Sequence, residues 1–196
     1  MTKHNKSWYV QGKVIKVNDK MQQYTYKLMY NAGTNLNNGG YTIDGQKIVY
    51  ADFNPFYTPS QMLSMGVFEG KYINDCDHEF PKEWYTHANK YNKLSPKKAD
   101  PSVNYFKIKS RLSLQEWKKR GWIPIHTKDK DVRGWFQWYC RYWIGRRIPE
   151  VDIIQIKRWK SFARHFAQVK KHASGDINKR IRQRQALLQW SWNCKI

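Results

Sequence analysis

The sequence GWFQWYCRYWIGRR, from Gly134 to Arg147, decides the fold of this chain. Wound as a helix, it is aromatic on nearly every side: one side carries Trp135, Trp138, Tyr139 and Tyr142, and another carries Phe136, Cys140 and Trp143. A helix that is apolar all round is ordinarily buried at the centre of a domain. The segment therefore predicts a central helix over residues 131–144 that ends at Gly145, with most of these rings in the core.

The polar side chains of this segment need partners. Gln137 and Arg141 are i, i+4 neighbours on the expected helix, and burying them without hydrogen bonds is costly. The partners open to them are an acid, a backbone carbonyl or a bound phosphate. Arg146 and Arg147 stand just before the next helix, whose N-terminal N–H groups attract an anion. This placement predicts that Arg146 and Arg147 contact phosphate.

The C-terminal part is expected to form two further helices. One begins at Pro149 and covers about residues 150–172, with its apolar side chains on one face. Its cations form a separate stripe: Lys157, Lys160, Arg164 and Lys171. An ordinary amphipathic helix is the plain reading, but the near absence of acids favours a surface that follows a phosphate backbone. The last helix, over residues 179–192, opens with Arg180, Arg182 and Arg184. Cations at a helix start are unfavourable because they oppose the helix dipole, and a bound polyanion would offset this cost.

The N-terminal half has the patterns of strands and short helices. Alternation over residues 7–17 and 23–30 predicts a β-hairpin, and residues 41–50 predict a second, short one around Asp44-Gly45. Thr58 and Ser113 each open a capping-box sequence that is followed by a short helix.

Together these patterns predict an α+β fold that is mostly helical. The helical body covers about residues 58–192, and an N-terminal β-hairpin ribbon covers about residues 7–50. The corresponding division is a β-ribbon appendage over residues 1–57 and a helical nucleic-acid-binding domain over residues 58–196.

The composition carries a strong charge signal. The 196 residues include 36 Lys and Arg against 15 Asp and Glu, a formal net charge of +21. All eleven arginines lie at or beyond Arg111, and eight of the ten tryptophans lie at or beyond Trp117. Arg recognises phosphate with two parallel hydrogen bonds, and interleaved basic and aromatic side chains are what a nucleic-acid surface requires. The alternative is that the aromatic residues form the core and the cations only aid solubility.

The sequence favours an intracellular protein without a membrane partner. It contains no apolar run of the roughly 18–20 residues that a spanning helix needs, and its first residues lack the apolar stretch of a secretory signal. Cys76, Cys140 and Cys194 have no spacing typical of a disulfide framework.

Catalytic candidates are few. Asp75-Cys76-Asp77-His78-Glu79 concentrates acids, a thiol and an imidazole, and Asp152 lies on the first turn of the long expected helix. If the protein is an enzyme, Asp75, Asp77, Glu79 or Asp152 would act as acid, base or Mg²⁺ ligand. A local acidic loop and a helix-start carboxylate are the alternatives. No zinc-ligand pattern, P-loop, GxSxG, HExxH or Rossmann fingerprint occurs.

The chain resembles a widespread family of small proteins of bacteria, phages, fungi and plants. The resemblance covers roughly residues 55–192 and is most specific in the GWFQWYCRYxxGRR motif between Gly134 and Arg147. It extends through Thr58–Leu63, Asp152 and Arg182–Leu188. It implies a shared fold and brings no activity with it, and the N-terminal ribbon departs from the pattern. A weaker similarity in character links the chain to helical phage enzymes that hypermodify thymine in DNA.

The function expected from these observations is nucleic-acid binding, with duplex DNA favoured over RNA. The expected phosphate-binding residues are Arg141, Arg146, Arg147, Lys157, Lys160, Arg164, Arg180, Arg182 and Arg184. One alternative is an enzyme that modifies DNA or a nucleotide, with thymine hypermodification or related base or phosphate chemistry. Another is a structural protein of a ribonucleoprotein or virion. No resident metal or other cofactor follows from the sequence.

Overall fold

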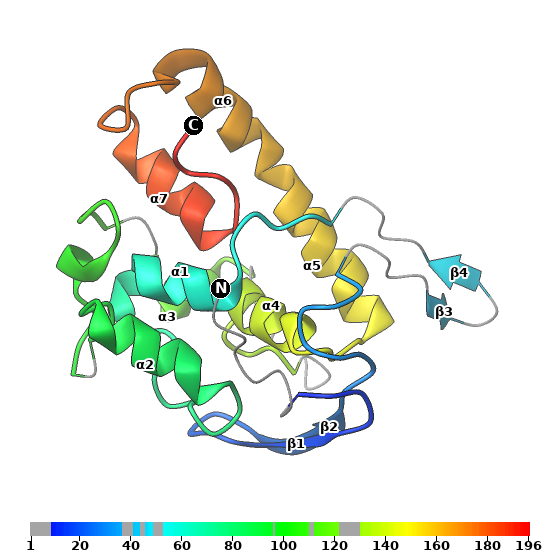
Figure 1. The fold of residues 1–196 in the computed structure, drawn as a ribbon. Coiled ribbons are helices and arrows are strands. Elements are labelled where there is room, and N and C mark those ends of the chain that lie inside the picture. The colour runs from blue at the N-terminus through cyan, green and yellow to red at the C-terminus, as the bar shows by residue number, and fades with distance from the viewer. Residues whose placement is uncertain are drawn as a thin grey trace.

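The computed structural model describes residues 9–36, 41–43, 46–48, 53–95, 97–109, 112–121 and 130–196 (Figure 1). Within these ranges the protein is mainly helical, as the sequence predicts. The helices are α1 (Pro59–Met65), α2 (Lys82–Lys90), α3 (Leu114–Lys119), α4 (Trp135–Trp143), α5 (Pro149–Ser161), α6 (Ala163–Ala173) and α7 (Ile181–Gln189). Short 3₁₀ turns occupy Phe68–Gly70 and Pro101–Val103. No helix in the described ranges has both the length and the apolar character needed to cross a lipid bilayer.

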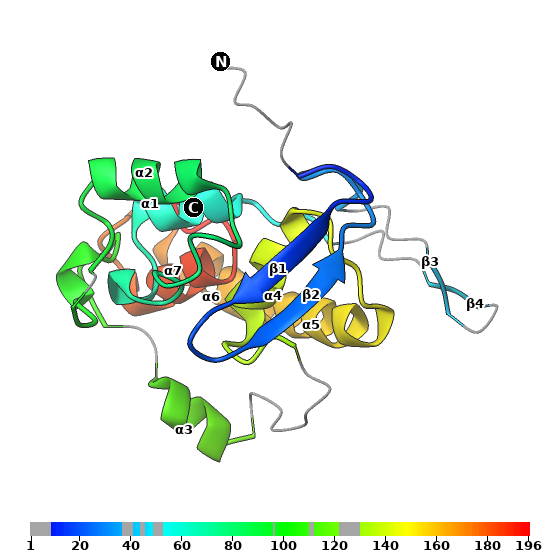
Figure 2. The same ribbon diagram turned by 90° about the horizontal axis from the view of Figure 1, so that it is seen from below.

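Two antiparallel hairpins precede the helices. Strands β1 (Val14–Asn18) and β2 (Gln23–Lys27) pair with Val14 opposite Lys27, and β3 (Tyr41–Ile43) pairs with β4 (Gln46–Ile48). Both hairpins fall where the sequence predicts them, although the expected turn Asp44-Gly45 lies outside the described residues. In Figures 1 and 2 the second hairpin stands away from the helices, whereas β1–β2 lies across α4.

Helix α4 is the centre of the core. Its aromatic side chains are almost fully buried: Trp135, Phe136, Trp138, Tyr139 and Tyr142 are each exposed by 4 % or less. The expectation that these rings are structural is therefore confirmed. The helix begins at Trp135 rather than at Asp131, because residues 131–134 form a turn that ends in Gly134 with φ +86°.

Gly145 ends α4 in a way that also docks the first hairpin. Its φ is +112°, and a Cβ at this position would come within 2.0 Å of the carbonyl oxygen of Tyr30. The Gly145 carbonyl accepts hydrogen bonds from the N–H groups of Met29 and Tyr30 at 2.8 and 3.2 Å. Only a residue without a side chain allows this close approach of the two backbones.

The two parts of the chain on either side of residue 57 share one core. Ile15 and Leu28 of the hairpin segment are 5 % and 1 % exposed and belong to the same buried cluster as the α4 rings. Phe53 is fully buried, and its ring makes edge contacts with Tyr142 and Trp159, with centroids 5.4 and 5.1 Å apart. The division at residue 57 stays a prediction about organisation, but the ribbon's apolar face is packed rather than free.

The long C-terminal helix is broken. The sequence predicts one helix over residues 150–172, whereas α5 ends at Ser161 and α6 begins at Ala163. At the break the N–H of Phe162 donates to the Trp159 carbonyl, three residues back, and the Phe162 ring stacks on Trp190 at 4.4 Å. The tightened turn points the Phe162 ring at α7, so packing there accounts for the bend.

Local sequence signals set several helix ends. Thr58 accepts from the N–H of Gln61 and the Gln61 side chain accepts from the N–H of Thr58, which completes the predicted capping box of α1. Ser113 caps α3 by accepting from the N–H of Glu116. The last helix, expected over residues 179–192, is shorter and covers only Ile181–Gln189.

Phe53 provides a test of the shared core. Phe53→Ala removes a ring from the contact between α4 and α5, and a loss of about 3–5 kcal/mol in the free energy of unfolding is expected in urea. Phe56→Ala is the matched control, because Phe56 is 59 % exposed and its loss should change stability by less than about 0.5 kcal/mol. Equal effects of the two substitutions would contradict a core that includes the segment before α1.

Candidate nucleic-acid interface

Arg141 on α4 is the centre of a buried ionic network. Its side chain is fully buried, and its Nε and Nη2 atoms donate to the two carboxylate oxygens of Glu79 at 2.6 and 3.0 Å. Nη1 donates to Asp131 at 3.1 Å and also to the Lys130 carbonyl. Glu79 accepts a further hydrogen bond from the Tyr26 hydroxyl at 2.8 Å. The network therefore joins α4 to the segment before α2 and to strand β2.

The charge on Arg141 is maintained despite its burial. Removal from water lowers the pKa of a guanidinium, but the carboxylates of Glu79 and Asp131 raise it by more, so the pKa of Arg141 lies well above its ordinary value. Tyr24 and Tyr26 of the hairpin cover this guanidinium, with ring centroids 5.4 and 6.0 Å from its Cζ atom. Burial raises the pKa of Tyr24 to about 12, so the phenol stays neutral.

Arg146 and Arg147 are also buried. Arg146 is 2 % exposed and donates to Asp131 at 2.5 Å. Arg147 is 8 % exposed, donates to the Tyr142 carbonyl at 2.6 Å, and places its guanidinium 3.5 Å from the Tyr142 ring centroid. Neither side chain lies on the surface before α5, where a phosphate was expected.

A second arginine pairs with the acidic loop. Arg133 donates to Asp75 at 2.9 Å and lies 3.5 Å from Asp19. Asp19 also accepts the N–H groups of Met21 and Gln22 at 2.7 and 2.8 Å and so shapes the turn between β1 and β2. Burial raises the pKa of the Asp19 carboxyl, but these N–H groups and the charge of Arg133 outweigh it and leave the pKa below its ordinary value.

The thiol beside Asp19 does not complete a metal site. Ligand atoms of Asp19, Cys76 and Glu79 all lie within 4.8 Å of one another. Arg133 and Arg141 already balance the two carboxylates, and burial raises the pKa of the Cys76 thiol so that it stays protonated. A divalent cation here would face two fixed positive charges, so the donor set does not fit one.

Arg184 on α7 has a different set of buried partners. Its side chain is fully buried and, among the described residues, donates to backbone oxygens. These are the carbonyl oxygens of Ala173, Asp176, Lys179, Cys194 and Ile196, at 2.6 to 2.9 Å. The guanidinium thus ties the end of α6, the turn that follows it and the C-terminal segment to α7.

Four of the nine expected phosphate contacts are corrected by this geometry. Arg141, Arg146, Arg147 and Arg184 each hold internal carboxylates or carbonyls and are at most 8 % exposed, so they are not available to a ligand at the surface. Arginine suits a buried role because its planar group can satisfy several acceptors at once. The other five, Lys157, Lys160, Arg164, Arg180 and Arg182, are exposed.

The exposed cations lie together on the C-terminal helices. Beyond Asp152 the chain has eleven Lys and Arg and a single acid, Asp176. Besides the five expected residues, Lys170, Lys171 and Lys179 are exposed there. Figure 1 shows α5 and α6 as one bent rod with α7 beside α6, so these side chains belong to one region of the molecule.

The four candidate catalytic acids are not brought together as one open site. Glu79 holds Arg141 in the buried network, and Asp75, which is half-buried, holds Arg133. Asp77 is exposed, and one of its oxygens lies 3.9 Å from Nδ1 of His78.

Asp152 has a structural role at the start of α5. It is 1 % exposed and accepts hydrogen bonds from the indole N–H of Trp138 at 2.6 Å and from the N–H of Ile148 at 2.9 Å. It therefore caps α5 and fixes that helix against α4, in agreement with the reading of a helix-start carboxylate.

Comparison of the chain with protein-family models, curated proteins and solved structures finds no significant match.

The network includes residues that sequence reasoning missed. Asp19, Asp131 and the hairpin tyrosines Tyr24 and Tyr26 were not candidates, because each stands alone in its own segment. One signal was present: Arg141 on an otherwise apolar helix requires an acid from elsewhere in the chain.

Breaking the ion pair between Arg141 and Glu79 should strongly destabilise the fold. Arg141→Met leaves the carboxylates of Glu79 and Asp131 buried without their cation, and a loss of about 3–5 kcal/mol in the free energy of unfolding is expected by urea denaturation. Arg120→Met removes the exposed partner of Glu116 on α3 and should cost at most about 0.5 kcal/mol. A mild effect at Arg141 would mean that the network does not hold the hairpin to α4.

Asp19 predicts a pH dependence of stability. Its pKa in the folded state lies below the ordinary value of about 3.9, so as the pH falls the unfolded chain takes up this proton first. The stabilisation is complete above about pH 5 and is lost as the pH falls through the lowered pKa. In urea titrations, wild type should exceed Asp19→Asn in stability at pH 7, and the difference should shrink below about pH 4. A difference that is constant with pH would rule out a contribution from the ionised carboxylate.

Proposed function

We propose that the protein binds nucleic acid, with duplex DNA as the favoured ligand, through the exposed cations of α5, α6 and α7. One observation supports this most directly: beyond Asp152 these helices and the turn between them expose many cations and carry one acid, Asp176. Neutralising successive phosphates with such cations releases counterions and provides sequence-independent affinity.

The arrangement of the cations suits a regular polyanion. From Lys157 to Lys171 the exposed row extends about 21 Å at 1.5 Å per residue along the bent rod of α5 and α6. Duplex DNA carries one charge per about 1.7 Å of its axis, so several phosphates fall within that length. Lys179, Arg180 and Arg182 add charge at the start of α7, where the Arg184 hydrogen bonds hold the turn in place.

The row consists of Lys157, Lys160, Arg164 and Lys171. Removing its four positive charges tests whether it binds the duplex. A variant with Gln at all four positions should bind a short duplex more weakly, because up to four phosphate contacts are lost. The slope of log affinity against log salt should fall by about 3 to 4, measured by fluorescence anisotropy between about 50 and 200 mM NaCl.

A charge-matched variant separates the row from net charge. Lys16, Lys20, Lys82 and Lys90 are exposed on the first hairpin and on α2, away from the C-terminal helices (Figure 1). Their replacement by Gln removes the same formal charge and should leave the salt slope within about one of wild type. Equal losses in the two variants would assign binding to overall charge instead of to this face. A flat salt response of the wild type would reject phosphate-dominated binding.

A further inference from the structure

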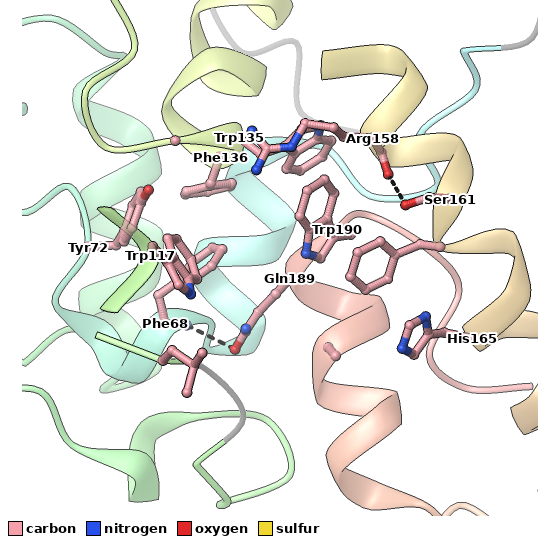
Figure 3. Close-up of a pocket in the computed structure, with 14 residues that line it drawn as sticks. Phe68, Tyr72, Trp117, Trp135, Phe136, Arg158, Ser161, His165, Gln189 and Trp190 are labelled. Atoms are coloured by element: carbon pink, nitrogen blue, oxygen red, sulfur yellow. Dashed lines mark hydrogen bonds between the residues drawn. The ribbon is translucent and has the colours of Figure 1, made fainter. Parts of the chain in front are cut away.

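A pocket of about 530 Å³ opens between α3, α4, α5, α6 and α7 (Figure 3). This volume falls within the range of about 300–1,000 Å³ that is usual for small-ligand sites. Its lining is mostly aromatic and apolar: Phe68, Tyr72, Leu112, Trp117, Gly134, Trp135, Phe136, Phe162, Ala186 and Trp190. The polar lining residues are Arg158, Ser161, His165 and Gln189.

One wall of the pocket is a column of stacked rings. The ring of His165 stacks on Phe162 at 4.9 Å, Phe162 on Trp190 at 4.4 Å, and Trp190 lies over Trp135 at 4.8 Å. The planes in these pairs are within 19° to 31° of parallel. Trp135 stacks in turn on Tyr139 in the core at 5.1 Å, which anchors the column to α4. Because these rings cover one another's faces, the wall presents mainly their edges to the pocket, and the stacking on Tyr139 holds it in place.

Trp117 of α3 forms the opposite side. Figure 3 shows it across the pocket from Trp190, with Gln189 between them at the base. Trp117 is half-buried and its ring centroid lies 6.5 Å from that of Tyr72. The oxygen of the Gln189 amide accepts from the Phe68 N–H at 3.4 Å, so a polar group with a defined orientation lies at the floor. The Trp117 indole on one side, ring edges on the other and a polar floor favour a flat ring with hydrogen-bonding edges.

The charge around the mouth favours an anion. Arg158 is a charged residue of the lining, and no carboxylate occurs among the described residues that form it. Ser161 lines the pocket at the end of α5, Lys157 of the row stands one turn before it on α5, and Arg164 follows in the first turn of α6. On α7, exposed Arg182 stands one turn before Ala186, another lining residue. The phosphate-binding row and the pocket thus share an edge.

We propose that this pocket receives a single unstacked base of a nucleic acid whose backbone lies along the row. This inference rests on the proposed function and deepens it by naming the part of the ligand that enters the fold. A base has the required flat π-face, and its own phosphates would lie toward Lys157 and Arg164. An apolar peptide lacks the negative charge that the rim attracts, and a free anion lacks the ring that the walls fit. Stacking between a base and aromatic side chains is largely independent of base identity.

An unpaired base in a duplex is the probe. Bases in a regular helix must leave the stack before they enter a pocket, and the cost is least where the base is already unpaired. The experiment compares a short duplex carrying one bulged thymine with the same duplex carrying an abasic residue at the bulge. The two probes have the same phosphates and the same interrupted backbone. The wild type should bind the bulged base about 5- to 150-fold more tightly than the abasic probe, the range measured for stacking of one base on protein aromatic rings.

Variants of Trp117 assign the effect to the pocket. Trp117→Ala should bring the ratio of the two affinities to about one, whereas Trp117→Phe, which keeps a ring, should retain most of it. The row variant should weaken binding of both probes and leave their ratio above one. Equal binding of both probes by the wild type, or an unchanged ratio in Trp117→Ala, would overturn the pocket assignment and leave the proposed function in place. Failure to bind either probe would overturn both.

Discussion

The ion pair between Arg141 and Glu79 is the constraint on which the rest of the structure depends. A guanidinium at the centre of an aromatic helix can be accommodated only if carboxylates reach it. Glu79 comes from a segment 62 residues earlier in the sequence, and Asp131 from the turn directly before α4. Glu79 also accepts a hydrogen bond from Tyr26, which fixes the hairpin over α4. Asp131 also pairs with Arg146, which places the turn before α4 beside that side chain. The pair adds little net stability compared with an apolar replacement of the same shape, but it allows few arrangements of these segments.

The arginines and lysines of the chain divide into two groups by role. Arginines of the central motif satisfy internal acceptors, while the exposed row is mostly lysine. Arg184 links the two groups, because its backbone contacts hold the turn from which Lys179 and Arg180 project. The net charge of the chain therefore overstates the positive charge that a ligand meets, and the C-terminal helices account for the part that is concentrated.

Local and periodic signals predicted the fold well. The aromatic helix, the first hairpin and the Thr58 cap depend on neighbouring residues, and each occurs in its predicted segment, although α4 begins four residues later than expected. The break at Phe162 depends on packing against Trp190, which periodicity does not contain. The candidate site was predicted only in part for the same reason. Exposure of the row follows from helical periodicity in residues 157–171. The burial of Arg146, in contrast, depends on Asp131 and two hairpin tyrosines, and the pocket requires five helices to meet.

The three free cysteines have a chemical consequence. Cys76, Cys140 and Cys194 are each fully buried, and burial raises the pKa of all three thiols, so almost no reactive thiolate exists in the folded chain. Cys76 lies under the hairpin turn, Cys140 within α4, and Cys194 beside Tyr57 near the C-terminal segment. Each sulfur is inert towards electrophiles for as long as its own region stays closed. The rate at which each thiol is alkylated would therefore report how often its own region opens, so the three cysteines give three separate measures of local unfolding.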